Sequence, residues 1–297
     1  MADATGTIAR DIGSEAFWRA HFPNLHIGQL LSQELREKTL DAPPRNSLAL
    51  NVERMKVDGY FQDRDDTVAR LAPILGDAVR TCNRIDIPPA FIFLFDEAWE
   101  CFYALHQHLT PFLGDYQILP DFWAWHVDPK ASESGWSPHR DKGYGALDVN
   151  GNPLSLTVWI PLSEATPLSS CMYVLPKSRD PVYGTPEDKN WKIDYPSIRA
   201  LPGKPGDFFC WDQAVLHWGS ASSPFANGPR ISMALEFQRT DAAPFNKPLL
   251  PAFCNLDFKS RLWLVGKQIM QYRHMYKVRP EFEALATSLL KVGQGTA

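Results

Sequence analysis

The stretch 136-WSPHRDKG-143 places a histidine and an aspartate, His139 and Asp141, two residues apart near the middle of the chain. On a β-strand, residues i and i+2 point to the same face, so these side chains would offer an imidazole nitrogen and a carboxylate oxygen to one metal ion. The triplet alone is weak support, because a lone histidine in a strand is more often packed and hydrogen-bonded than bound to metal. A metal site therefore requires a third ligand from another segment.

The same triplet, 139-HRD-141, also begins the catalytic loop of protein kinases, which carries an asparagine five residues after the aspartate. That position holds Ala146, no GxGxxG precedes it, and the only DFG-like run is 206-GDFF-209. The sequence therefore excludes a kinase. A hydrolase that uses Ser137 and His139 is also disfavoured, because the chain has no GxSxG nucleophile elbow.

Two histidines follow Asp141 and can supply the third ligand. His217 lies in a β-like run, 213-QAVLHWG-219, whereas His274 falls among basic residues on an expected C-terminal helix. His217 is therefore the better candidate. Two histidines and one carboxylate leave half of an octahedral coordination sphere open, and this arrangement is typical of non-haem iron oxygenases.

A second pattern follows thirteen residues after His217, where Arg230 and Ser232 would share one face of a strand. A guanidinium fork and a hydroxyl together suit a buried carboxylate. The HxD triplet, the later histidine and the Arg-x-Ser pair form a much rarer coincidence than any one of them. The sequence therefore predicts a metal site beside a carboxylate-binding site.

The composition is that of an ordinary globular protein: 297 residues, 44% hydrophobic and 22% charged, with a net charge of -4. The negative charge argues against a nucleic-acid partner. The five cysteines include no CxxC pair and suit a reducing compartment. Neither a signal peptide nor a run of 18 apolar residues is present, so we expect a cytoplasmic protein without a membrane partner.

The first part of the chain, residues 1–117, has mainly helical patterns. Four helices are expected: one capped by Ser14, one over 26–41, one that begins at Asp65 or Asp66, and one over 97–109 that Asp96 caps and Thr110-Pro111 ends. The third helix should bury one face, since apolar residues recur at three-to-four spacing at Val68, Leu71, Leu75 and Val79. The run 91-FIFLF-95 is expected to be extended.

From residue 118 onward short β-like runs alternate with turn signals. These runs are 122-FWAWHV-127, 155-SLTVWI-160, 171-CMYVL-175, 206-GDFFCW-211, 213-QAVLHWG-219 and 230-RISMALEFQ-238. The long polar loop 177–197 is expected to be a functional excursion or lid. We therefore expect one domain over 1–297, mainly β with flanking helices: helical support in 1–117, a β core in 118–240 and C-terminal helices in 241–297.

Over residues 118–240 the chain resembles the Fe(II)- and 2-oxoglutarate-dependent oxygenases, and most closely the phytanoyl-CoA dioxygenase-like (PhyH) branch. The resemblance rests on motifs in the family's order and spacing: 138-PHRDKG-143, 155-SLTVWIPLSEA-165, 171-CMYVLPKSRD-180, 203-GKPGDFFCWDQAVLHWG-219 and 229-PRISMALEFQ-238. It implies a double-stranded β-helix (jelly-roll, cupin-like) core and the use of Fe(II), 2-oxoglutarate and O2.

The resemblance also implies a role for each matched residue. His139, Asp141 and His217 would hold the iron, Arg230 with Ser232 would bind the distal carboxylate of 2-oxoglutarate, and Trp159 with Thr157 would line the cosubstrate pocket. Halogenases of the family have Gly or Ala in place of the carboxylate, so Asp141 implies hydroxylation or a related oxidation such as desaturation or ring formation.

The substrate is expected to be a small molecule, such as an amino acid or a natural-product intermediate, and its pocket is expected to be formed by residues next to the metal motif: Trp125, His126, Trp136, Lys142 and Tyr144. A β-barrel that binds a metal or ligand without turnover is the alternative from another class. The chain is expected to be a monomer or a homodimer.

Overall fold

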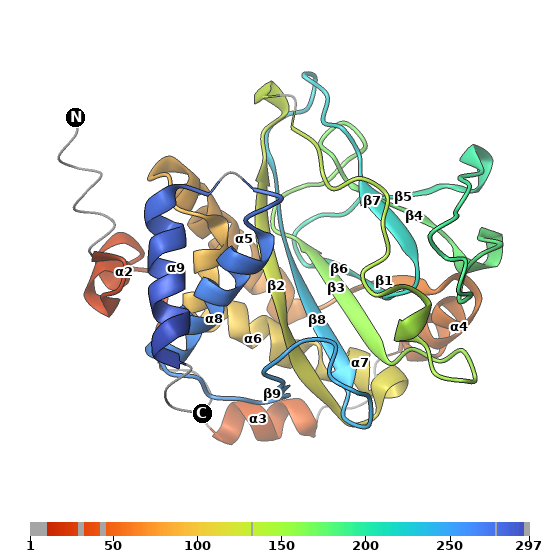
Figure 1. Cartoon of the computed structure of the whole chain (residues 1–297), viewed down its shortest axis with the longest axis horizontal. Coiled ribbons are helices and arrows are strands. Elements are labelled where there is room, and N and C mark those ends of the chain that lie inside the picture. Colours follow the sequence, from red (N-terminus) through yellow and green to blue (C-terminus); the bar gives the residue numbers. More distant parts are fainter. Residues whose placement is uncertain (1–10, 29–32, 42–45, 132, 277, 294–297) are drawn as a thin grey trace.

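The computed structural model describes residues 11–28, 33–41, 46–131, 133–276 and 278–293, and it combines two antiparallel sheets with flanking helices (Figure 1). The larger sheet has the strand order β1-β6-β3-β8-β2-β9, and the smaller one has the order β5-β4-β7. The strands are β1 Tyr60–Arg64, β2 Tyr116–Val127, β3 Ser155–Pro161, β4 Met172–Leu175, β5 Arg199–Leu201, β6 Asp207–Asp212, β7 Leu216–Gly219, β8 Arg230–Arg239 and β9 Leu250–Pro251.

The helices come mainly from the two ends of the chain, as expected. They are α2 Glu15–His21, α3 Gln33–Leu40, α4 Leu48–Asp58, α5 Asp66–Arg84, α6 Asp96–Ala104, α7 His106–Leu113, α8 Phe258–Tyr272 and α9 Pro280–Gly293. Among the described residues, these helices contain more of the chain than the strands do. The expectation of a mainly β protein is therefore corrected to a mixed α and β architecture.

Helix α5 shows how the local sequence determines its element. The Asp65 carboxylate accepts hydrogen bonds from the backbone N–H groups of Thr67 and Val68, which caps the helix and contributes about 1 kcal/mol. The expected apolar face is buried, with Leu71 and Leu75 at most 1% exposed. This face packs with α6, α8 and η1 (Pro89–Leu94) against one side of the large sheet (Figure 1).

Strand β3 is buried along its whole length because both faces of the large sheet are covered. Leu156, Val158 and Ile160 point into the cluster beneath the helices. Trp159 points the other way, into a second cluster shared with Val174 and Met172 of the small sheet. The candidate site lies on this second side, between the two sheets.

Three helical expectations are wrong in detail. The run 91–95 forms the 3-10 helix η1 instead of an extended segment. The single helix expected over 97–109 is two helices, α6 and α7, and Pro111 lies inside α7. Asp96 is the first residue of α6 instead of its cap, because its carboxylate accepts from the Arg261 guanidinium at 2.6 Å and from the Gly28 N–H at 3.0 Å.

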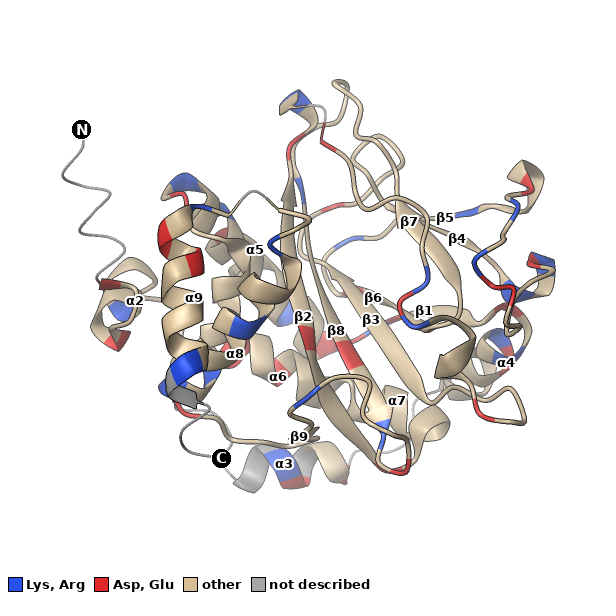
Figure 2. Cartoon of the chain, viewed as in Figure 1, with Lys and Arg blue, Asp and Glu red and all other residues tan. Residues whose placement is uncertain are grey.

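Of the helix expected over 26–41, the described residues show α3, Gln33–Leu40, whereas 26–28 are not helical and 29–32 lie outside the described residues. No helix in the described part of the chain is long and apolar enough to cross a membrane. Figure 2 shows that basic and acidic residues are interspersed along the helices and outer loops. It also shows one acidic position on each of the neighbouring strands β2 and β8.

Candidate active site

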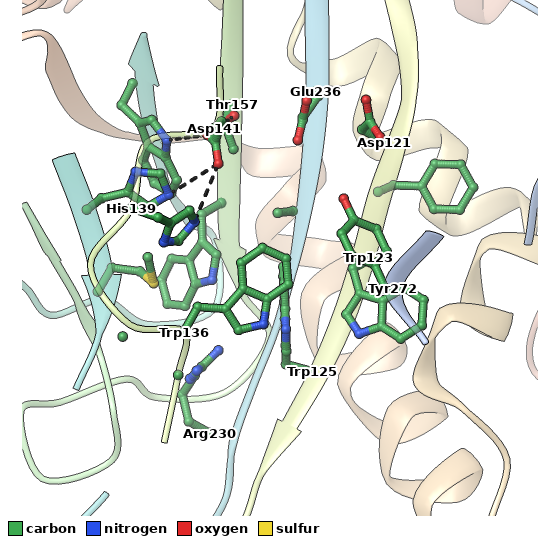
Figure 3. Close-up of a pocket in the computed structure, with 18 residues that line it drawn as sticks. Asp121, Trp123, Trp125, Trp136, His139, Asp141, Thr157, Arg230, Glu236 and Tyr272 are labelled. Carbon is green, nitrogen blue, oxygen red and sulfur yellow. Dashed lines mark hydrogen bonds and ion pairs between the residues drawn. The ribbon is translucent and has the colours of Figure 1, made fainter. Parts of the chain in front are cut away.

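The expected metal ligands converge, although His139 and Asp141 do not lie on one continuous strand. His139 forms a single antiparallel bridge with His217 of β7, with both backbone N···O distances at 3.0 Å, and Asp141 lies in the bend that follows. The Nε2 atoms of His139 and His217 lie 3.6 and 3.5 Å from Asp141 Oδ1. One ligand atom from each residue lies within 4.8 Å of the other two, so the three side chains could hold one metal ion (Figure 3).

The remaining polar atoms of these residues are used elsewhere. Nδ1 of His139 lies 2.8 Å from the Ser137 carbonyl, and Nδ1 of His217 lies 3.1 Å from the Val215 carbonyl. A carbonyl can only accept, so each Nδ1 carries the proton and each Nε2 has a free lone pair. The backbone thereby selects the imidazole tautomer that ligates through Nε2.

The carboxylate of Asp141 is oriented by two donors. Its Oδ2 accepts from Thr157 Oγ1 at 2.7 Å and from Trp211 Nε1 at 3.1 Å, which leaves Oδ1 to face the two imidazoles. Burial acts to raise the pKa of Asp141, but His217, His139 and the Thr157 hydroxyl outweigh it and keep that pKa below its usual value. Burial lowers the pKa of His217 to about 4. At neutral pH both groups are therefore in the unprotonated form that binds a metal.

Arg230 is a buried cation without an anionic partner among the described residues. It is 2% exposed, its Nη1 donates to Ser232 Oγ, and its Nε has no hydrogen-bond partner. Its guanidinium carbon lies 5.7 Å from the centre of the Trp159 ring. Burial lowers the pKa of Arg230 to about 10, which leaves it charged at neutral pH. A buried, uncompensated guanidinium is costly, and a ligand carboxylate would remove that cost.

A cavity of about 60 Å³ joins the two sites, and both the metal-ligand group and Arg230 line it (Figure 3). Thr157 and Trp159 line it too, from β3. Trp125 contributes its indole from β2 of the same sheet, and Trp136 does so from the segment before His139. A second cavity of about 560 Å³ lies behind Trp125 and Trp136. The indole N–H groups of these two tryptophans both donate to the hydroxyl of Tyr276, and the three side chains form the wall between the cavities.

The other residues expected near the substrate are placed differently. His126 lines the second cavity and not the first. Tyr144 is 49% exposed and lines neither cavity, and its backbone N–H donates to Asp188 Oδ2. Lys142 places its ammonium 3.5 Å from Asp121 Oδ2 and 3.3 Å from Glu236 Oε2, and both acids line the metal-site cavity. Of the five residues expected near the substrate, the structure therefore places Trp125 and Trp136 at the metal-site cavity. Lys142 is linked to that cavity through its ion pairs with Asp121 and Glu236.

Sequence reasoning missed several residues of the cavity: Asp121, Trp123, Trp211, Glu236 and Tyr272. Glu236 could have been found, because it continues the alternation of Arg230 and Ser232 along one strand face. Asp121 could not, because it follows Pro120 at a β-bulge of β2 that local patterns do not reveal.

Side-chain hydrogen bonds anchor the loop 177–197 next to the site. The Arg140 guanidinium donates to Asp180 Oδ2 at 2.6 Å and to the Asp188 carbonyl at 3.0 Å. Tyr183 donates its hydroxyl to Asp212 Oδ2 at 2.8 Å. Arg140 therefore ties this loop to the segment that carries the metal ligands, and the role of the loop as a lid stays a prediction.

The donor set and the orphaned guanidinium fit a ferrous ion and a dicarboxylate, and the sequence comparisons agree. A sequence model of the phytanoyl-CoA dioxygenase family (PhyH) matches residues 53–226. The chain belongs to this family, so it is an oxidoreductase of the oxygenase class that depends on iron and 2-oxoglutarate. None of the curated protein sequences that were compared matches the chain.

The solved structures that are similar to the chain have low sequence identity to it. The non-heme monooxygenase ThoJ in its apo form is 13% identical over 80% of this chain and 98% of its own, with a TM-score of 0.53. AviO1 from Streptomyces viridochromogenes Tue57 is 17% identical over 68% of this chain and 99% of its own, with a TM-score of 0.50. The non-heme alpha ketoglutarate dependent epimerase SnoN is 16% identical over 69% of this chain and 92% of its own, with a TM-score of 0.49. ThoJ and AviO1 share the fold of this chain.

Proposed function

We propose that the chain is a dioxygenase that hydroxylates an unactivated C–H bond of a small molecule and converts 2-oxoglutarate into succinate and CO2. His139, Asp141 and His217 hold the iron. One observation carries this proposal: the two Nε2 atoms and Asp141 Oδ1 point at one another, while every other polar atom of the three side chains is bound by the protein. Such preorganised ligands leave half of the metal positions open.

Iron(II) with 2-oxoglutarate and O2 supplies the oxidant for C–H cleavage, and the protein binds, orients and excludes water. Arg230 binds the distal carboxylate of 2-oxoglutarate, and Ser232 holds the guanidinium in place through Nη1. Trp159 lies beside Arg230 and walls the cosubstrate pocket. Thr157 orients Asp141 and does not itself need to touch the cosubstrate.

We further propose that residues 1–297 form one domain whose 118–240 core is a double-stranded β-helix. Two facing antiparallel sheets with the metal-ligand group between them support this proposal. The carboxylate of Asp141 occupies the position that a halide would need, which favours hydroxylation over halogenation. Desaturation or ring closure would use the same residues and would differ only in the product.

The test measures succinate release. The protein is loaded with Fe(II) in the absence of oxygen, mixed with 2-oxoglutarate and each member of a panel of metabolites, and then exposed to air. We expect metabolite-dependent succinate, its loss in His217→Ala, and its retention in His274→Ala, which removes an exposed histidine that lines neither cavity. A mass gain of one oxygen in the product identifies hydroxylation, and a loss of two hydrogens identifies desaturation or ring closure. Tight iron binding without succinate would instead support a non-catalytic binding protein.

A further inference from the structure

The metal-site cavity has an acidic end, defined here as Asp121 and Glu236. Asp121 is 1% exposed and Glu236 is 9% exposed, and both line the cavity that the metal-ligand group lines. The bulge of β2 at Pro120 shifts the register between Leu119 and Phe122, and bulges next to active sites re-aim side chains in this way. Glu236 lies on the adjacent strand β8, so the two carboxylates face the cavity side by side (Figure 3).

The acidic end holds two carboxyl groups and one nearby ammonium. Lys142 is the only described cation that forms an ion pair with either carboxylate, at 3.5 Å to Asp121 and 3.3 Å to Glu236. Lys267 is the next cation, but its ammonium is hydrogen-bonded to Asn246 and Gln271. The two buried carboxyl groups thus share one ammonium. Asp121 Oδ1 also accepts from Asn246 Nδ2 at 2.6 Å and from Gln271 Nε2, so Glu236 is the less satisfied of the two.

Glu236 presents a free oxygen to the cavity. Its Oε2 accepts from Gln213 Nε2 at 2.7 Å, whereas no described residue donates a hydrogen bond to its Oε1. Burial, together with the carboxylates of Asp121 and Asp141, raises the pKa of Glu236 to about 8 in spite of Lys142. Both facts indicate that the protein alone does not satisfy this carboxylate.

Aromatic rings line the cavity from the acidic end towards Arg230: Trp123 and Tyr272 lie beside Asp121, whereas Trp125 is in register with Ser232 (Figure 3). Trp123, Trp125, Trp136 and Tyr272 line the same cavity, and their π-faces attract cations. This is an independent indication of positive charge in the ligand, because neither the metal nor a dicarboxylate requires aromatic walls at this place. Buried carboxylates beside aromatic rings together suit an organic ammonium group better than a neutral or anionic one.

The acidic end also lies close to the expected reaction site. Glu236 pairs directly with Thr157 across β3 and β8, and Thr157 donates to the metal-facing carboxylate of Asp141 at 2.7 Å. Adjacent strands are about 4.8 Å apart, so a group bound at Glu236 lies within about 10 Å of the metal ligands. A carbon atom a few bonds from the bound group would therefore reach the metal.

We propose that Asp121 and Glu236 bind a protonated amine of the substrate, so that the enzyme oxidises a small organic cation at a carbon a few bonds from its nitrogen. This inference rests on the proposed function, since it names the substrate class of that same site. Asp121, Glu236 and the aromatic walls determine specificity, and the metal-ligand group and Arg230 remain the reaction centre.

The test compares two probes of equal size, ethylammonium and ethanol, by titration of the metal-loaded protein with 2-oxoglutarate at constant ionic strength. Tryptophan emission reports binding because Trp123, Trp125 and Trp136 line the cavity. We expect ethylammonium to bind saturably. Its half-saturation concentration should be lower, by about tenfold or more, than the concentration at which ethanol gives any response. Absent binding, or equal binding of both probes, would overturn the proposal.

Two isosteric variants, Glu236→Gln and Asp121→Asn, keep the shape of the site and remove one ionisable carboxyl group each. We expect each to weaken ethylammonium binding by about tenfold or more, while Asp241→Asn, which changes an exposed carboxylate outside the cavity, leaves it unchanged. Metal affinity and the thermal midpoint show whether each variant is folded. Undiminished binding in a folded Glu236→Gln variant would refute the assignment.

The outcomes separate this inference from the proposed function. A protein that releases succinate with iron but does not prefer the cation retains the function and loses the inference. A protein that prefers the cation but shows no iron-dependent succinate release retains the cation-binding site and loses the proposed function. In the metabolite panel, amines should outperform their N-acetyl derivatives, because acetylation removes the charge.

Discussion

The hydroxyl of Thr157 should control metal affinity although it binds no metal. Thr157 is 4% exposed, and its Oγ1 donates to Asp141 Oδ2 at 2.7 Å and accepts from Gln213 Nε2 at 2.9 Å. The substitution Thr157→Val keeps the branched shape and removes this donor. Asp141 then keeps only the Trp211 indole as a donor to Oδ2, and its carboxylate can rotate away from the two imidazoles.

The size of the effect follows from the bond that is lost. A hydrogen bond to a charged group contributes about 1.5–3 kcal/mol, and about 1.4 kcal/mol corresponds to a factor of ten. Removing an outer-shell partner of a metal ligand typically costs about 10–100-fold in metal affinity, which is the same range. We therefore expect Thr157→Val to weaken Fe(II) or Mn(II) binding by about 10–100-fold.

The assay is anaerobic calorimetric titration of the metal-free protein with each ion. Thr157→Ser is the matched control, because it keeps the hydroxyl and loses one methyl group, and it should stay within about threefold of the unmodified protein. Thermal unfolding without metal shows whether the variants are folded. The reasoning is refuted if Thr157→Val binds metal normally, or if Thr157→Ser loses as much affinity as Thr157→Val, since packing would then be the cause.

Three further expectations follow from buried groups. Arg230→Ala should raise the 2-oxoglutarate concentration for half-maximal succinate release by about 10–100-fold and leave iron affinity within about threefold, because it removes a charged carboxylate contact; equal losses of both would count against the assignment. The five cysteines are free and buried, and burial raises the pKa of Cys82 to about 12, so thiol reagents at pH 8 should label the folded protein far more slowly than the unfolded one; rapid labelling would contradict the packing. Burial raises the pKa of Asp212 from 3.8 to about 6, so the folded state retains a proton that the unfolded state releases. Stability should therefore fall by about 2 kcal/mol through this group as the pH rises from 4 to 6, and Asp212→Asn should remove that part of the slope in denaturant titrations.

The parts of the fold that follow from short-range patterns were predictable. Helix α5 was expected from an Asp cap and a 3.6-residue apolar period, and both depend on neighbouring residues only. Each of the six β-like runs overlaps a strand, because alternation and turn residues are local as well, although 213–215 form the turn that precedes β7. The convergence of His139, Asp141 and His217 was also expected from their spacing. However, His139 is positioned by a single bridge to His217 of β7, and His139 and Asp141 do not share a continuous strand.

The parts that depend on distant contacts were not predictable. Asp96 does not cap α6 because Arg261, 165 residues away, takes its carboxylate. The break between α6 and α7 precedes Pro111 by several residues, so the proline did not locate it. Asp121 reaches the cavity only through a bulge whose register is set by pairing with β8. In each case tertiary packing overrides the local preference.

Strand β8 explains why the sequence revealed one end of the cavity and concealed the other. Arg230, Ala234 and Glu236 lie on the same face of this strand, and all three line the cavity. Six residues at about 3.4 Å each place the Cα atoms of Arg230 and Glu236 about 20 Å apart along the strand, and the small side chain of Ala234 leaves space between the two side chains. A single alternating strand thus gives the cavity a cationic end for a carboxylate and an acidic end for an amine. Asp141 is hydrogen-bonded to Thr157, which pairs with Glu236, so the metal-ligand group lies nearer the acidic end than Arg230 does. A dicarboxylate and an organic cation can therefore approach one metal without competing for the same charge.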